Sequence, residues 1–223
     1  MKKLITFSLW GDDPKYTVGA IRNAELAERL YPDWTCRFYI GEHTLGAVEY
    51  QFLCQKSNVE YVKMPAGMEG WKGMFARFLP ASEDDVDVFI SRDCDSRLSE
   101  REVYAVNEWL ASPRLIHAMR DHPEHSVPIL GGMWGAKRHA IPNMKELIDK
   151  WNREDRWQTD QEFLRDMIWP QHHHKVMAHD DRNRFPSAAD NRWFPEREGD
   201  DFVGAIIGPN EERLHPEHHA MVR

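Results

Sequence analysis

Two aspartates separated by one residue are the strongest chemical signal in the sequence. Asp93 and Asp95 follow a short apolar run, 86–90, whose β-branched and aromatic residues are typical of a buried strand. If the backbone stays extended, both carboxylates point to one side, with Cα atoms roughly 7 Å apart. Carboxylates this close resist joint ionisation unless a cation lies between them. Such oxygen ligands suit Mg²⁺ or Mn²⁺, which take further ligands from water and substrate phosphates.

The same spacing also has an ordinary structural interpretation. An Asp-X-Asp tripeptide occurs often by chance, and Ser96 and Ser99 are equally typical of a loop that leads into a helix cap. The position of the pair favours the metal site, because ligands of open α/β sheets bind outside the carboxyl ends of strands.

Composition and charge narrow the class of protein. The chain has 223 residues and a net charge of -8, and we predict one large domain over 1–223. The sequence has no block of Lys and Arg, which argues against nucleic acid or an anionic membrane surface as a partner. A small anionic substrate stays compatible, because a metal ion and a few arginines can reverse the local charge.

Cysteine usage and the N-terminal sequence indicate the compartment. Cys36, Cys54 and Cys94 are odd in number and lack metal-ligand spacing, which favours a reducing compartment, and we expect a cytoplasmic protein. The opening apolar run is interrupted at Gly11 and has no cleavage-site pattern, so it is typical of a first strand and not of a signal peptide. No stretch reaches the ~18 apolar residues that a membrane span requires.

Hydrophobic periodicity predicts alternating strands and helices in the first part of the chain. This alternation implies right-handed crossovers and a mainly parallel sheet. The expected strands are 3–10, 34–40, 59–62 and 86–90, and the expected helices are 17–30, 45–54 and 71–79, the last ended by Pro80.

The second half of the sequence is less regular. Capping boxes predict helices that begin at Ser99, Asn143 and Thr159, and Pro170 is expected to end the third. The paired glycines Gly131 and Gly132 permit a bulge or a close backbone approach to a ligand. The expected helices run over 99–110, 143–151 and 159–168, and the expected strands over 114–119, 127–132, 176–179 and 202–207.

Two further features can carry chemistry. Arg77 lies sixteen residues before Asp93, where its planar guanidinium can hold a diphosphate, although it is equally compatible with an ordinary surface arginine. The helix start at Thr159 has a sound structural role as a capping box, but it also presents Asp160 and Gln161 to a polar ligand.

These features together resemble a known enzyme family. The run GMFARFLPASEDDVDVFISRDCDSRL is similar to the segment of metal-dependent, GT-A-fold nucleotide-sugar glycosyltransferases in which an Arg-bearing helix precedes a strand ending in Asp-X-Asp. Residues 130–135 and the pair Asp160-Gln161 resemble later motifs of the glycogenin and lipopolysaccharide galactosyltransferase group. The opening ITFSLWGDDPKYTVGAIRNAELA resembles short bacterial and viral glycosyltransferase domains. The resemblance covers roughly 3–168.

The resemblance implies both a fold and a reaction. The fold would be a GT-A-like α/β single domain with a mainly parallel central sheet flanked by helices, Rossmann-like in its N-terminal half. Residues 1–98 would form the nucleotide-binding half and 99–223 the acceptor-side half. The reaction would transfer a sugar from a nucleotide-diphosphate sugar, with a UDP-sugar expected, to a hydroxyl of a glycan or other acceptor in glycan or polysaccharide synthesis. Mn²⁺ or Mg²⁺ would be the cofactor.

The resemblance also assigns roles to individual residues. Asp95 would ligate the metal most directly, and Asp93 would reach the metal or the ribose. The catalytic set would be Arg77 at the donor sugar or its phosphates and Asp160 with Gln161 beside the reacting carbon. Asp160 would be the base of an inverting reaction, and the sequence leaves inverting and retaining chemistry open. The expected nucleotide-sugar-binding residues are Phe7, Ser8, Leu9, Trp10, Tyr16, Arg77, Arg92, Asp93, Cys94, Asp95, Gly131 and Gly132.

One motif of the glycogenin-like group is missing. Its metal-binding histidine segment, His-X-X-Gly-X-Lys-Pro-Trp, does not occur in this chain. His179 is the expected substitute as third metal ligand, and His215 or His218 comes next, whereas 172–174 is interpreted as a histidine-rich loop.

Aromatic residues near the motifs add candidates for sugar stacking. Trp10, Trp71 and Trp134 lie beside the motif segments, whereas Trp109 and Trp151 have helical spacing typical of core.

Two other functions are compatible with the motifs. An Asp-X-Asp phosphohydrolase would place its pair after the first strand with Thr or Val two residues later, where this chain has Arg97. A non-catalytic sugar-binding module of the same fold is the second alternative.

Overall fold

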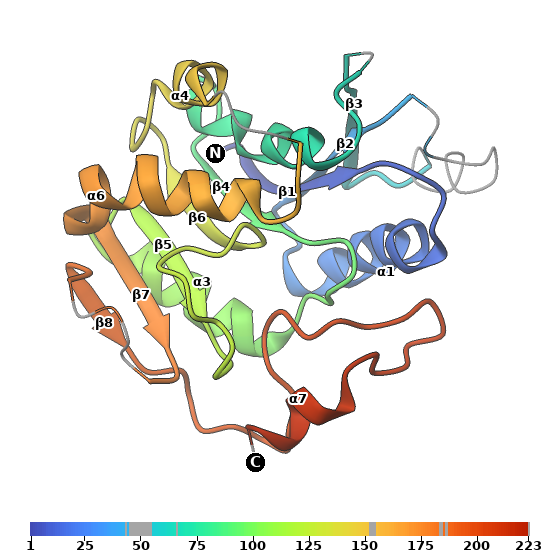
Figure 1. The fold of residues 1–223 in the computed structure, drawn as a ribbon. Coiled ribbons are helices and arrows are strands. Elements are labelled where there is room, and N and C mark those ends of the chain that lie inside the picture. The colour runs from blue at the N-terminus through green and yellow to red at the C-terminus, as the bar shows by residue number, and fades with distance from the viewer. Residues whose placement is uncertain are drawn as a thin grey trace.

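The computed structural model describes residues 1–42, 44, 55–65, 67–151, 155–182, 185 and 187–222. These residues form an eight-stranded sheet in the order β3-β2-β1-β4-β6-β5-β7-β8 (Figure 1). Strand β6 is antiparallel to both of its neighbours, β4 and β5, and every other pair is parallel. The mainly parallel sheet expected from the sequence is therefore confirmed. The strands are β1 (Lys3–Leu9), β2 (Thr35–Ile40), β3 (Val59–Lys63), β4 (Val88–Arg92), β5 (Ile116–Arg120), β6 (Met133–Lys137), β7 (Val176–Asp180) and β8 (Asp190–Arg192).

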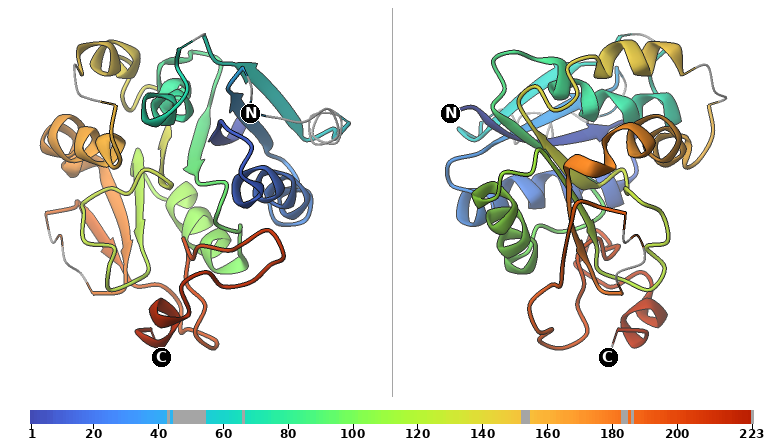
Figure 2. Two further views of the ribbon diagram at one scale, coloured as in Figure 1. Left: turned by 45° about the vertical axis from the view of Figure 1, so that its right-hand side comes forward. Right: turned by 90° about the vertical axis from the view of Figure 1, so that its left-hand side faces the viewer.

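Helices cover both faces of the sheet (Figure 2). Helices α1 and α3 pack on one face, and η1, α4 and the α5 to α6 run pack on the other. Within the described part of the chain, every helix is too short or too polar to traverse a lipid bilayer. The helices are α1 (Pro14–Leu30), η1 (Trp71–Ser82), α3 (Glu100–Ala111), α4 (Met144–Lys150), α5 (Thr159–Phe163), η2 (Leu164–Ile168), α6 (Trp169–His172), η3 (His173–Lys175) and α7 (Pro216–Ala220).

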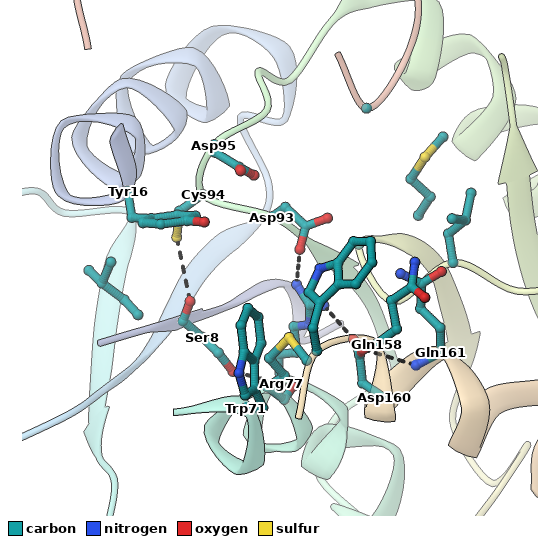
Figure 3. A pocket seen from close by; sticks show the side chains of 18 of the residues that line it. Ser8, Tyr16, Trp71, Arg77, Asp93, Cys94, Asp95, Gln158, Asp160 and Gln161 are labelled. Carbon is teal, nitrogen blue, oxygen red and sulfur yellow. Dashed lines mark hydrogen bonds and ion pairs between the residues drawn. The ribbon is translucent and has the colours of Figure 1, made fainter. Parts of the chain in front are cut away.

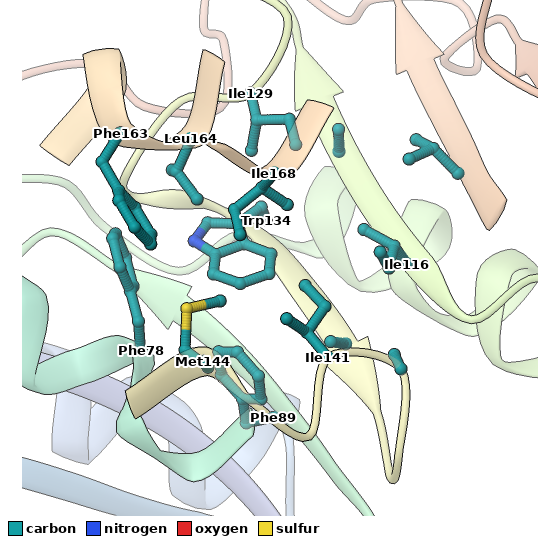
Figure 4. Close-up of a cluster of buried hydrophobic side chains, with 14 of the residues drawn as sticks. Phe78, Phe89, Ile116, Ile129, Trp134, Ile141, Met144, Phe163, Leu164 and Ile168 are labelled. Atoms are coloured by element: carbon teal, nitrogen blue, oxygen red, sulfur yellow. The ribbon is translucent and has the colours of Figure 1, made fainter. Parts of the chain in front are cut away.

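The side-chain alternation of the central strands divides the core in two. On β4, Val88 and Ile90 pack towards α1 and α3, whereas Phe89 packs towards η1 and α5. Trp134 of β6 is buried on the second face, with its ring 5.2 Å from Phe78 and 5.1 Å from Phe89 (Figure 4). This aromatic layer fixes η1 against the sheet, and η1 carries Arg77.

Most expected elements of the N-terminal half are present at nearly the expected bounds. Helix α1 begins earlier than expected because the Asp13 side chain caps it, accepting from the Lys15 backbone N–H at 2.9 Å. Ser99 caps α3 as expected, accepting from the Glu102 backbone N–H at 3.3 Å. The expected helix 45–54 lies outside the described residues, as does Cys54.

Proline did not end helices where the sequence indicated. Pro80 lies inside η1, which runs on to Ser82, and Pro170 lies in the first turn of α6. At that N-terminal position the missing N–H of Pro170 has little cost. The chain therefore continues from α5 through the π-helical turn η2 into α6 and η3, so that 172–174 is helical and not a loop.

Two strands expected in the second half are wrong. The strand expected at 127–132 lies later, at β6, and 127–132 forms the irregular segment that precedes it. Residues 202–207 are irregular apart from a turn at 203–204 and an isolated bridge between Ile207 and Arg213. The expected capping box at Thr159 is also wrong, because Thr159 is already helical and Gln158 precedes it without a capping bond.

Candidate active site

A cavity of about 520 Å³ opens at the carboxyl ends of β1 and β4. It lies between these strand ends, η1, the segment 130–133 and the start of α5 (Figure 3). Its volume is within the ~300–1,000 Å³ typical of small-molecule sites. The end of the parallel strands is also where α/β sheets bind ligands.

Helix α1 holds the turn that carries the two aspartates. The chain leaves its extended conformation after β4 and turns at Cys94 and Asp95, so the expected extended pair is replaced by a turn. The Asn23 amide donates to the Ser96 carbonyl at 2.8 Å and accepts from the Leu98 N–H at 3.0 Å. Gly19 permits this packing, because a Cβ there would collide with the Cys94 carbonyl. Both Asp93 and Asp95 line the cavity as a result.

Arg77 joins the aspartate turn to α5. Its guanidinium donates to the Asp93 carboxylate, to the Arg92 carbonyl at 3.1 Å and to Asp160 Oδ2 at 2.9 Å. Burial acts to lower the pKa of Arg77, but the charges of Asp93 and Asp160 outweigh burial and raise it. Arg77 is therefore charged, and its orientation is fixed by two carboxylates.

Asp160 is a buried carboxylate at the first turn of α5. It is 2% exposed, and its Oδ1 accepts from the Gln161 backbone N–H at 2.9 Å. Burial raises the pKa of Asp160, and Arg77 opposes that rise. Both oxygens are thus engaged, one by Arg77 and one by the helix start.

The glycine pair leaves space for these charged groups. A Cβ at Gly131 would collide with the Asp160 carboxylate and would lie 2.7 Å from Arg77 Nη2. A Cβ at Gly132 would collide with the Asp93 carboxylate. Ser91 holds the segment in place by donating to the Gly131 carbonyl at 2.7 Å. The close backbone approach expected of these glycines is therefore made to the side chains of the site itself.

Asp93 and Asp95 have the properties of ligands for a divalent cation. Burial raises the pKa of Asp95, and the charge of Asp93 raises it further, while Lys15 opposes both with its Nζ 3.3 Å from Asp95 Oδ2. Asp93 is paired with Arg77, which also pairs with Asp160, so these three carboxylates face two cations. No third carboxylate or imidazole among the described residues forms a three-ligand group with them. Two carboxylates with water and phosphate oxygens are a common Mg²⁺ arrangement, so the residues fit such an ion.

Most of the expected site residues line this one cavity, but Phe7, Trp134 and Arg92 do not. Phe7 is fully buried, with its ring stacked on Phe38 at 4.8 Å, and Trp134 is in the core. Arg92 points to the opposite face of β4, where its Nε donates to Glu102 at 3.1 Å. The expected residues that line the cavity are Ser8, Leu9, Trp10, Tyr16, Trp71, Arg77, Asp93, Cys94, Asp95, Gly131, Gly132, Asp160 and Gln161.

His179 is not placed to be the third metal ligand. It is fully buried on β7, with Nδ1 2.9 Å from His117 Nε2 and Nε2 3.1 Å from Glu108 Oε2. Both ring nitrogens are therefore engaged away from the cavity. His215 and His218 group with Glu217 at α7 instead of with the aspartate pair.

Several other residues that line the cavity were not expected from their sequence pattern. Trp157 and Gln158 directly precede α5, and Met74 lies one turn before Arg77 on η1. His125, Gly204 and Ile206 come from irregular segments that tertiary packing brings to the cavity. The Ile207 N–H donates to the Asp95 carbonyl at 2.8 Å and so ties the C-terminal segment to the aspartate turn.

No family model matches the sequence, and no curated protein matches it either. Solved structures do match the fold. A glycosyltransferase involved in the glycosylation of the major capsid of PBCV-1 superposes with a TM-score of 0.53 and 16% identity, over 81% of this chain and 82% of that one. The chain has a GT-A-like fold.

Other solved proteins share the GT-A-like fold with this chain. The mannosyltransferase PcManGT from Pyrobaculum calidifontis, solved with GDP-Man and Mn²⁺, has a TM-score of 0.52 and 11% identity, over 81% of this chain and 55% of that one. A 4-diphosphocytidyl-2C-methyl-D-erythritol synthase from Anaerococcus prevotii has a TM-score of 0.53 and 12% identity, over 80% of this chain and 86% of that one. The GT-A-like fold therefore does not by itself decide the reaction.

Proposed function

We propose that this chain is a glycosyltransferase that moves a sugar from a nucleoside diphosphate sugar to a hydroxyl acceptor. The observation that carries the proposal is the arrangement of Arg77 between Asp93 and Asp160, with Asp95 beside them, in one cavity at the carboxyl ends of β1 and β4 (Figure 3). A buried guanidinium next to an anionic ligand pair suits a diphosphate leaving group. A UDP-sugar is our first expectation for the donor, and the GDP-Man bound by PcManGT makes GDP-sugars the second.

Asp93 and Asp95 would hold Mn²⁺ or Mg²⁺ in this proposal. The bound ion would neutralise charge on the diphosphate as it leaves. Asp93 is suited to this contact because 46% of its side chain is exposed in the cavity wall, whereas 15% of the Asp95 side chain is exposed. Asp93 would then face the donor and Asp95 would hold the ion from the turn.

Arg77 and Asp160 would bind and orient the donor. Arg77 would stabilise the departing diphosphate, since a preorganised cation acts where charge develops. Asp160 fixes the guanidinium and lies beside Gln161, which lines the same wall. Because burial raises the pKa of Asp160, its carboxylate is also a better proton acceptor than an exposed aspartate, as an inverting reaction would need.

The test is a hydrolysis screen of UDP-, GDP- and dTDP-sugars with Mn²⁺. We expect release of free sugar from at least one donor by the wild type and no release by Asp95→Ala. Asp85→Ala is the matched control, because Asp85 precedes the other end of β4 and is paired with Lys2 on the surface. An Asp95→Ala protein as active as the wild type would refute the assignment of the ion site.

Further substrates, tested beside the nucleotide sugars, separate the competing reactions. A protein that ignores every nucleotide sugar but joins CTP or UTP to a sugar phosphate, with release of diphosphate, would instead be a nucleotidyltransferase, as the fold of the Anaerococcus prevotii synthase allows. Hydrolysis of simple phosphate esters alone would favour the phosphohydrolase. Binding of a donor without any turnover would favour the sugar-binding module.

A further inference from the structure

Trp157 presents a large apolar ring to solvent in the wall of the cavity. Nine large hydrophobic residues are exposed within the described part of the chain, and two of them, Trp71 at 37% and Trp157 at 64%, line the cavity. An indole left open to water forgoes the gain of burying its surface. Exposed apolar surface in a cavity that also carries convergent polar groups is typical of a ligand contact.

The backbone holds Trp157 at this place. Gln158, which follows it, has φ 65° and ψ 10°, a left-handed backbone conformation that residues other than glycine rarely adopt. Of the non-glycine residues with positive φ in the described ranges, Gln158 is the one that lines the cavity. Its carbonyl accepts from the Glu162 N–H at 3.0 Å and so starts α5. Such uncommon backbone conformations concentrate at functional sites.

The segment before Trp157 is fixed to the helix that carries Arg77. The Asp155 carboxylate accepts from the Lys72 backbone N–H at 3.0 Å, in the first turn of η1. Gly70 allows this approach, because a Cβ there would lie 3.0 Å from Asp155 Oδ2. Trp157 is thus held between η1 and α5, the two elements that supply Arg77 and Asp160.

The cavity has two sides, and Gln158, which follows Trp157 in the chain, lies on the side away from β1 (Figure 3). Ser8 and Tyr16 lie to one side of Asp93, and Gln158, Gln161 and Asp160 lie to the other (Figure 3). If the diphosphate lies at Asp93, the β1 side is left for the nucleoside and the α5 side for the sugars. Asp160 is 2% exposed in this cavity, whereas Trp157 is 64% exposed. If the donor sugar lies beside Asp160, the exposed Trp157 ring is left for the acceptor.

We propose that Trp157 is a stacking platform for a pyranose ring of a glycan acceptor. This inference rests on the proposed glycosyltransferase function. The apolar face of a pyranose packs on an indole ring, and its hydroxyls hydrogen-bond to polar groups at the ring edge. Gln158 and Gln161, which line the same wall, supply amide donors and acceptors of that kind.

The experiment compares Trp157→Ala with Trp193→Ala. Trp193 is 65% exposed but does not line the cavity, so it controls for the loss of an exposed indole. Donor hydrolysis is measured without acceptor, and transfer is measured to the p-nitrophenyl pyranosides of glucose, galactose, mannose and N-acetylglucosamine. We expect Trp157→Ala to raise the acceptor KM about tenfold with an unchanged donor KM, and Trp157→Phe to recover most of the loss. Trp193→Ala should match the wild type in both assays.

Failure of this inference differs from failure of the proposed function. A wild type that consumes no nucleotide sugar would overturn the proposed function. A wild type that hydrolyses a donor but transfers to none of the four pyranosides would overturn the stacking platform alone. The same holds if Trp157→Ala leaves the acceptor KM unchanged, or if it raises the donor KM instead.

Discussion

Arg77 offers the sharpest test of how the site is held together. Its side chain is 5% exposed and its partner Asp160 is 3% exposed, with 2.9 Å between Nη2 and Oδ2. Arg77→Met removes the charge, keeps most of the volume and leaves Asp160 as a buried carboxylate without a cation. Removing one partner of such a buried pair costs about 3–5 kcal/mol. We expect the free energy of unfolding to fall by this amount at pH 7.

Arg37 provides the matched control for this substitution. Its side chain is also buried, at 7% exposed, and it also contacts two carboxylates. Its partners Glu60 and Glu83 are 39% and 33% exposed, so water can replace the guanidinium. Each such partly exposed pair contributes about 0–1 kcal/mol, and Arg37→Met should therefore cost no more than about 2 kcal/mol.

A double substitution isolates the pair itself. Asp160→Asn in the Arg77→Met background removes the unpaired charge and should recover most of the lost stability. Unfolding in urea, followed by far-UV circular dichroism, gives the four free energies of the cycle. An Arg77→Met protein that loses no more stability than Arg37→Met, or additive effects of the Arg77 and Asp160 substitutions, would contradict a buried ion pair between these residues. Donor hydrolysis by Arg77→Met should fall about 10²–10³-fold if the guanidinium stabilises the leaving diphosphate.

Two further predictions concern Asp160 and the glycine pair. Burial raises the pKa of Asp160 above its ordinary 3.8 despite Arg77, so the folded state binds this proton more tightly than the unfolded state. The free energy of unfolding of the wild type should therefore fall relative to that of Asp160→Asn as the pH rises from 3.8 through the raised pKa, by at most about 1.4 kcal/mol per pH unit. Urea unfolding at a series of pH values measures this, and a difference between the two proteins that does not change with pH would contradict it. Gly132→Ala should displace the Asp93 carboxylate and so weaken Mn²⁺ binding, measured by calorimetry, while the circular dichroism spectrum stays unchanged. A variant that binds Mn²⁺ as tightly as the wild type would refute the steric argument.

The N-terminal half could be predicted from sequence because its signals are local. Strand β1 and helix α1 each show their own hydrophobic period, and Asp13 and Ser99 are short-range caps. Each element was identified from its own residues, without knowledge of its neighbours in space.

Strand β6 could not be predicted because its neighbours determine it. Its sequence, MWGAK, contains Gly135, where a Cβ would lie 2.5 Å from the Phe89 carbonyl and 2.8 Å from Ile90 Cγ2. The strand lies antiparallel between β4 and β5, and this tight packing excludes the β-branched residues that mark a strand in sequence. The apolar residues near Phe202 led to the wrong prediction of a strand, because these residues are buried by tertiary packing and not by pairing in the sheet. Phe202 packs 4.4 Å from the His122 ring without any strand partner.

The sequence could predict which residues lie together in the candidate site only where they belong to one short motif. Asp93 and Asp95 are separated by one residue in sequence and share the cavity, whereas Arg77 and Asp160 are 83 residues apart. The period of two along β4 could have excluded Arg92, because it points with Ile90 towards α3, whereas Ser91 points to the Gly131 side. A sequence alone does not tell which arginine of a motif faces the ligand, unless the strand bounds are known.

The charges around the cavity link the proposed ion to the proposed donor. Among the described residues, Asp93 and Asp160 are paired with Arg77, and Asp95 is paired with Lys15. Burial and the charge of Asp93 raise the pKa of Asp95 and outweigh the effect of Lys15. A diphosphate would bring further negative charge into this field, and like charges at such distances repel strongly where water is partly excluded. A divalent ion between Asp93 and Asp95 reverses the local sign. The loss of Asp95 is therefore expected to weaken donor binding itself and not only to slow the chemistry, because it removes a ligand of the ion that would hold the diphosphate.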